Sequence, residues 1–138
     1  MAKGKNVMAV VVGAVTGMIL ISAGEYIMQL LYPMPQGLDM NNHADMIMYV
    51  KQLTNAAFVF LMINYTIGSF GGGIVATLLS QREKPLSAVI VGAILTLGGL
   101  FNVLSLPHPL WFTISNLFIY IPMAYAGFRV MARKSSVS

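Results

Sequence analysis

The segment NYTIGSFGGGIVA at residues 64–76 decides the fold, because it combines a long apolar run with closely spaced glycines. At helical spacing it places Gly68, Gly72 and Ala76 one above another. In water each glycine would cost a helix about 1 kcal/mol. In lipid the backbone has no other hydrogen-bond partner and stays helical, while small side chains allow a second helix to approach closely. The segment therefore predicts a tightly packed membrane helix.

The composition of the whole chain also indicates a membrane protein. Of its 138 residues, 57% are hydrophobic and only 9% are charged, whereas roughly 25% of a soluble domain is charged. Lipid must therefore cover most of the apolar surface. The net charge of +4 does not indicate nucleic acid as a partner, since the cations flank the apolar runs instead of mixing with aromatic residues. The absence of cysteine excludes disulfides and thiolate metal sites.

Four apolar runs predict four transmembrane helices in a single domain, residues 1–138. The helices are expected over about residues 7–31, 54–80, 86–106 and 110–131. The first run could instead be a signal peptide cleaved after small residues at 22–24, but it continues to Leu31, so we expect it to be retained.

A short helix is expected between the first two runs. Asn42 followed by Asp45 is typical of a helix start, with a capping side chain and a carboxylate in the first turn. A helix over about 42–52 would lie at the membrane interface. The expected fold class is therefore all-α: a polytopic four-transmembrane-helix bundle with one short interfacial helix on its outer side.

The distribution of basic residues predicts the orientation. One side of the predicted bundle holds only Lys51. The other side holds Lys3, Lys5, Arg82, Lys84, Arg129, Arg133 and Lys134. Under the positive-inside rule both termini and the turn at 81–85 are cytoplasmic. We expect a multi-pass protein of the inner (plasma) membrane.

Small residues recur at helical spacing along all four runs, as helix packing in lipid requires. The predicted packing positions are Gly13, Gly17, Gly68, Gly72, Ala76, Gly92, Gly99 and Gly127. The glycines at 71–73 could be read as a phosphate-binding loop, but that motif needs a preceding strand and a helix start. They lie in the middle of a predicted helix, so we interpret them as packing residues. Some of these faces are also candidates for an oligomer interface.

A weak internal duplication is visible. Residues 9–14 read AVVVGA and residues 88–93 read AVIVGA, and both helices end at a Pro-x-Pro turn. The same alignment pairs Tyr65 with Tyr120. If the duplication is real, it predicts two hairpins related by a pseudo-two-fold axis along the membrane normal.

Polar residues within or near the runs are the candidate functional residues. They are Glu25, Asn64, Asn102, Asn116 and His108. Carboxylates inside membranes serve as proton relays or cation ligands, but Glu25 could also reach the outer interface or bond to a neighbouring helix. Asparagines either join helices, for about 0.6–2 kcal/mol each, or line a polar pocket that opens outward. Asn64 is expected near the membrane midplane.

No cofactor or metal is expected. His43, Asp45 and His108 lie on the predicted outer side, but their spacing resembles no known metal site. Both histidines lie outside the predicted transmembrane helices, which does not suit haem. The sequence also shows no Ser-His-Asp, Cys-His or paired-carboxylate arrangement, so the protein is not expected to be an enzyme.

The sequence allows two functions, of which we favour the first. The first is a non-catalytic small subunit or scaffold, which packs through glycine-rich helix faces with itself or with a larger membrane complex. A lipid or quinone site beside residues 46–49 is a variant of this hypothesis. The second is a small oligomeric transporter or channel for an ion or small solute, with Glu25 and Asn64 in the pathway. Expected partners are the lipid bilayer and either a second copy or a larger membrane complex, without nucleic acid.

Overall fold

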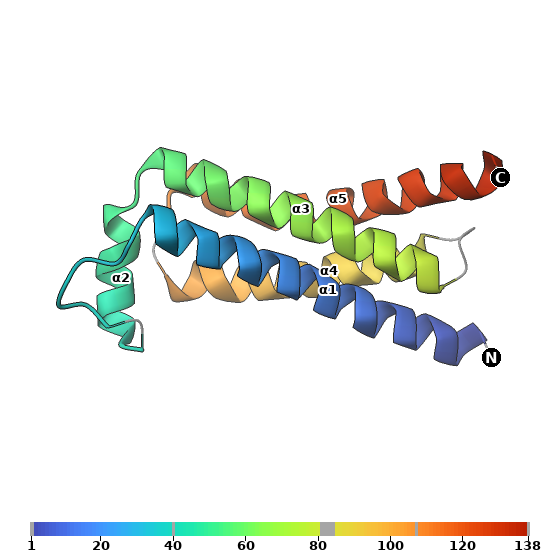
Figure 1. Ribbon diagram of the computed structural model, residues 1–138, viewed down its shortest axis with the longest axis horizontal. Helices are drawn as coiled ribbons and strands as arrows, with labels where there is room; N and C mark the ends of the chain where they lie inside the picture. The colour runs from blue at the N-terminus through green and yellow to red at the C-terminus, as the bar shows by residue number, and fades with distance from the viewer. Residues whose placement is uncertain (1, 40, 81–84, 107, 138) are drawn as a thin grey trace.

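The computed structural model describes residues 2–39, 41–80, 85–106 and 108–137, and these residues form five helices (Figure 1). The helices are α1 (Ala2–Leu31), α2 (His43–Gln52), α3 (Asn55–Leu79), α4 (Leu86–Ser105) and α5 (Leu110–Val137). All except α2 are long and apolar enough to cross a membrane. The predicted all-α architecture of four long apolar helices and one short helix is therefore confirmed.

The first and last helices are longer than expected. Helix α1 begins at Ala2 instead of residue 7, and α5 ends at Val137 instead of residue 131. Neither extension contains a proline, and their alanine, lysine and arginine residues favour helix. The predicted polar tail is thus helical almost to the end of the chain. The charged turn expected at 81–85 lies outside the described residues, apart from Pro85.

Side-chain caps mark the starts of both α2 and α3. The Asn42 side chain accepts hydrogen bonds from the backbone N–H groups of Ala44 and Asp45, at 2.9 and 3.3 Å. This is the helix start that the sequence predicted. The Thr54 hydroxyl oxygen accepts from the N–H of Ala57 at 3.4 Å. Because Thr54 begins a new helix, the chain turns there and α2 lies across the end of the bundle (Figure 1).

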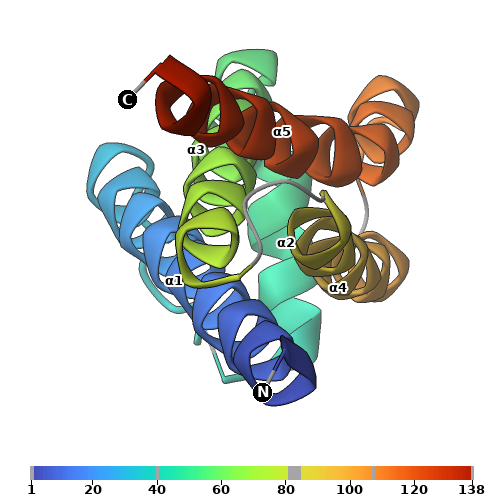
Figure 2. The same ribbon diagram turned by 90° about the vertical axis from the view of Figure 1, so that its right-hand side faces the viewer.

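Helix α3 is the central element of the bundle. It contacts α1, α4 and α5, as the view along the bundle shows (Figure 2). Helix α4 also contacts α1 and α5, whereas α1 and α5 make no close backbone contact in the described part of the chain. The possible duplication pairs α1 with α4 and α3 with α5. An exact two-fold repeat would therefore contain an α1–α5 contact equivalent to the contact between α3 and α4. The arrangement therefore departs from an exact two-fold repeat.

Helices α1 and α3 touch through their glycines. An ideal Cβ atom on Gly13 would lie 2.8 Å from the carbonyl oxygen of Gly72, and one on Gly72 would lie 2.9 Å from that of Gly13. One turn further along, a Cβ on Gly17 would lie 3.2 Å from the carbonyl oxygen of Gly68. Because these distances leave no room for a side chain, the two backbones meet directly.

The remaining predicted packing positions also lie between helices of this chain. A Cβ on Gly92 would meet Ile121 of α5, and one on Gly127 would lie 2.5 Å from the carbonyl oxygen of Phe70. Gly99 faces the Tyr120 hydroxyl in the same way. Ala76 is fully buried. All eight positions therefore take part in contacts inside the bundle.

Large apolar side chains cover the outward faces of the helices. On α4 and α5 they include Leu97, Phe101, Leu104, Leu110 and Phe118, all of which are at least two-thirds exposed. A water-soluble monomer rarely exposes so continuous an apolar surface. A hydrocarbon solvent accounts for it. The start of α1 and the end of α5 lie at one end of the bundle, and α2 lies at the other (Figure 1).

Asn64 adds a polar bond to the α1–α3 contact. Its amide nitrogen donates to the carbonyl oxygen of Ile21 at 2.9 Å. The Asn64 side chain is buried and occupies the space beside Gly24. This geometry joins two helices, which is the interhelical role that the sequence left open for asparagine.

Replacing Gly24 by alanine should destabilise the protein, because the added methyl group would overlap the Asn64 side chain. Asn64→Ala alone should cost about 0.6–2 kcal/mol through loss of its hydrogen bond. In the Asn64→Ala background, Gly24→Ala should cost much less, since the obstructing side chain is gone. Denaturant unfolding in detergent micelles measures all three variants. Gly98→Ala is the control, because a Cβ there meets nothing within 4 Å. Equal costs of Gly24→Ala in both backgrounds would contradict the assignment.

Candidate functional site

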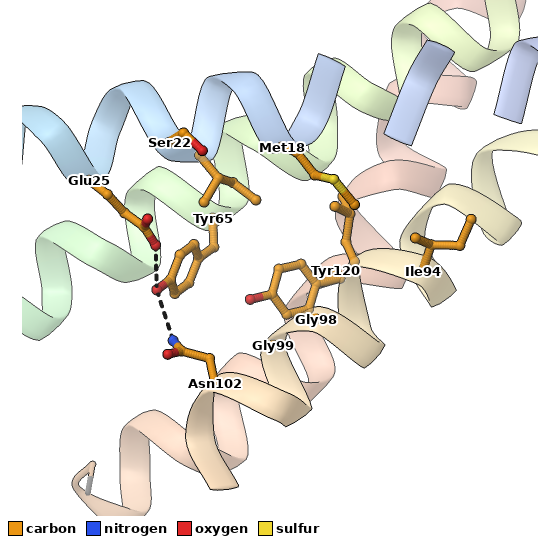
Figure 3. A pocket seen from close by; sticks show the side chains of 11 residues that line it. Met18, Ser22, Glu25, Tyr65, Ile94, Gly98, Gly99, Asn102 and Tyr120 are labelled. Atoms are coloured by element: carbon orange, nitrogen blue, oxygen red, sulfur yellow. Dashed lines mark hydrogen bonds between the residues drawn. The ribbon is translucent and has the colours of Figure 1, made fainter. Parts of the chain in front are cut away.

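Three polar side chains from three helices meet within the bundle (Figure 3). The hydroxyl group of Tyr65 on α3 donates to a carboxylate oxygen of Glu25 on α1 at 3.5 Å. The amide nitrogen of Asn102 on α4 donates to the Tyr65 oxygen at 3.4 Å. Both bonds are long for hydrogen bonds, so the cluster is loosely held. Tyr65 thus connects two of the predicted pocket residues.

A second polar layer lies behind Tyr65. The Tyr120 hydroxyl donates to the side-chain oxygen of Asn116 at 2.7 Å, and the rings of Tyr65 and Tyr120 are 6.0 Å apart between centroids. Asn116 is fully buried, and its amide nitrogen has no hydrogen-bond partner among the described residues. Asn116 therefore orients Tyr120 and does not reach the Glu25 cluster itself.

Two cavities adjoin the cluster, with volumes of about 180 and 170 Å³. Both are lined by Glu25, Tyr65 and Asn102. The first lies between α1 and α4, and Tyr120 is part of its wall. The second lies towards α2, and Met46 and Tyr49 of that helix line it. The Glu25 carboxyl group therefore lies in the wall that the two cavities share.

His108 lies at the far end of the second cavity, between α4 and α5. Its Nδ1 atom is 2.8 Å from the carbonyl oxygen of Leu106, so Nδ1 carries a hydrogen and donates. The ring stacks on Phe112 with 5.0 Å between centroids. Burial lowers the pKa of His108 below its usual 6.5. His108 therefore lines this cavity as a neutral imidazole at neutral pH.

Helix α2, which is not one of the predicted spans, forms part of the wall of the same cavity. The Tyr49 hydroxyl donates to the carbonyl oxygen of Tyr32 at 2.6 Å, which ties α2 to the end of α1. Burial raises the pKa of Tyr49, so the phenol keeps its proton. The short helix thereby has a defined position over the second cavity.

The five predicted pocket residues have three different locations. Glu25, Asn102 and His108 line the cavities, Asn116 lies behind them, and Asn64 lies in the α1–α3 contact. Tyr65 and Tyr120 were not among the site residues predicted from the sequence. The one signal that favoured them was their pairing in the possible duplication, and the structure places their rings side by side.

The cluster offers a carboxyl group, a phenol and an amide to a ligand. Glu25 is partly buried, and among the described residues it forms no ion pair. Such a carboxyl group can bind a proton, a metal cation or an organic cation. Within the described ranges, no three His, Cys, Asp or Glu side chains lie close enough to share a metal ion.

Comparisons of the chain with known protein families, with curated proteins and with solved structures find no match. Any function assigned to the site therefore follows from its own geometry and chemistry.

Proposed function

We propose that the protein is a small membrane transporter that binds an ion or small solute at Glu25. The observation that supports this function best is the position of the Glu25 carboxyl group in the wall shared by two cavities. A group placed there can exchange a ligand with either cavity, as a transport pathway requires. Carboxylates inside membrane proteins commonly serve as such binding groups.

Packing does not account for Glu25. Close contacts between glycines join α1 to α3, and Asn64 supplies the polar bond in that interface. Glu25 adds only the 3.5 Å hydrogen bond from Tyr65. Removing a carboxyl group from water is costly unless it is well paired. Ligand binding gives a reason for the residue that helix packing does not.

A non-catalytic subunit or scaffold, the function that the sequence favoured, is our second proposal. It rested on glycine-rich faces available to a partner, but these glycines contact helices of the same chain. Assembly with a second copy or a larger membrane complex would have to use other surfaces. Native mass measurement of the protein extracted in mild detergent tests this alternative, which requires co-purifying chains. Under either proposal the protein is not an enzyme.

We propose that the protein lies in the inner (plasma) membrane with both termini in the cytoplasm. The start of α1 and the end of α5 lie at the same end of the bundle (Figure 1), and their sequences hold Lys3, Lys5, Arg133 and Lys134. Lys51 is in α2, at the opposite end. Under the positive-inside rule the second cavity then lies on the outer side.

Glu25→Gln should abolish uptake by proteoliposomes, because the amide keeps the size of the side chain but cannot carry a negative charge. The assay presents K⁺, protons and small organic cations to wild-type protein, with a trapped pH-sensitive dye and radiolabelled solutes as readouts. Tyr65→Phe should reduce uptake less, since it removes two long, weak hydrogen bonds, to Glu25 and from Asn102, but leaves the carboxyl group in place.

Asp39→Asn is the matched control for this uptake assay, since it makes the same chemical change in the connection before α2, away from both cavities. It should transport as wild type does. The transporter proposal fails if wild-type protein moves none of these probes faster than empty liposomes, or if Glu25→Gln moves them equally.

Orientation can be measured with single cysteines, because the natural chain contains none. A membrane-impermeant maleimide added to intact cells should label Gly37→Cys and leave Ser136→Cys unlabelled until the membrane is opened. Gly37 is suitable because space around its Cβ position is open, although its φ of +92° makes the variant locally strained. Labelling of Ser136→Cys from outside would show that the orientation is reversed.

A further inference from the structure

The first cavity opens on the side of the bundle. Its deepest lining residues are buried: Tyr65 of α3, Leu95 of α4 and Tyr120 of α5. Its rim is exposed, with Met18 and Ser22 on α1 and Gly98 on α4. The opening therefore lies between α1 and α4 and faces sideways, toward the lipid around the bundle.

Gly98 lies at the rim of this opening and leaves space there. An ideal Cβ atom on Gly98 would meet nothing within 4 Å, although the residue lines the cavity. Its neighbours Leu97 and Phe101 are 67% and 74% exposed and point to the membrane. Gly98 lies seven residues, or about 10 Å along the helix, before the end of α4 at Ser105. The opening thus lies below the interface, at the level of the hydrocarbon.

The chemistry inside the opening is that of a receptor for a cation with an apolar body. Glu25 supplies a carboxyl group that has no ion-pair partner among the described residues. Tyr65 and Tyr120 supply aromatic rings, which attract ammonium groups through their faces. Ile94 and Leu95 supply apolar walls. A neutral or anionic ligand would leave the carboxyl group unmatched.

The size of the cavity limits the ligand. A volume of about 180 Å³ is close to the ~150 Å³ of an engineered apolar cavity that binds benzene. The enclosed part of the ligand is therefore about one ring in size. This is too small for a whole phospholipid headgroup with its glycerol, so the fit favours a free amphiphile over a membrane lipid.

We infer that the site takes a small amphipathic cation, an ammonium group on a single ring or short hydrocarbon, which enters sideways from the lipid between α1 and α4. The inference rests on the proposed transport function and names its ligand class and route. Such cations collect in the outer part of the bilayer, with the charged head at the interface and the apolar body in the hydrocarbon. From there the ammonium group reaches Glu25 without crossing the second cavity.

The test measures binding of phenethylammonium by calorimetry, with the protein in phosphatidylcholine nanodiscs. Wild-type protein should bind it, and should bind the neutral analogue 2-phenylethanol at least about tenfold more weakly. Gly98→Leu places a side chain in the opening and should weaken or slow binding about tenfold or more. Ala23→Leu is the matched control, because Ala23 is exposed on α1 but lines neither cavity, and it should bind as wild type does.

Ser22→Phe, on the opposite rim, provides a second blocking variant if Gly98→Leu unfolds. Thermal unfolding of each variant confirms that the bundle is intact. Wild-type affinity together with a wild-type binding rate in both rim variants would overturn the lateral route, and equal binding of 2-phenylethanol would overturn the ligand class. Neither result affects the transport proposal, which is decided separately by uptake in wild type and Glu25→Gln.

Discussion

The direct contact between the backbones of α1 and α3 is the constraint on which the rest of the structure depends. It occurs where Gly13 and Gly17 meet Gly72 and Gly68, and even one added methyl group would press on a carbonyl oxygen. In lipid no hydrophobic effect drives helices together, so close van der Waals packing must do so. With α1 held in this way, Glu25, two turns beyond Gly17, faces into the bundle beside Tyr65.

The position of α3 at the centre explains why the polar groups converge. Helix α3 touches α1, α4 and α5, so a side chain at its inner face can reach three neighbours. Tyr65 occupies such a position, and it contacts Glu25 and Asn102 by hydrogen bonds and lies beside Tyr120. A phenol suits this place because its ring is apolar while its hydroxyl group both donates and accepts.

Much of the architecture could be predicted because it depends on local sequence. Apolar run length predicts the spans, and Asn42 with Asp45 predicts the start of α2. The site was only partly predictable, because the rotation and pairing of helices depend on contacts between distant residues. Asn64 illustrates this. The sequence predicts its depth near the middle of the membrane, but only the packing shows that its side chain donates to the carbonyl oxygen of Ile21 and does not line a cavity. Tyr65 was missed for the same reason, since a tyrosine in an apolar helix resembles an ordinary core residue.

Asn64 and Glu25 differ in how well they are hydrogen-bonded, and this difference indicates different roles. Both are polar residues facing a neighbouring helix, yet Asn64 has a 2.9 Å bond to a carbonyl group whereas Glu25 has one at 3.5 Å beside two cavities. A buried polar group that only stabilises a fold is expected to be well bonded and closely packed. A binding group needs the opposite, a loose partner and free space into which a ligand can come. By this criterion Asn64 belongs to the packing of the bundle and Glu25 to the proposed site.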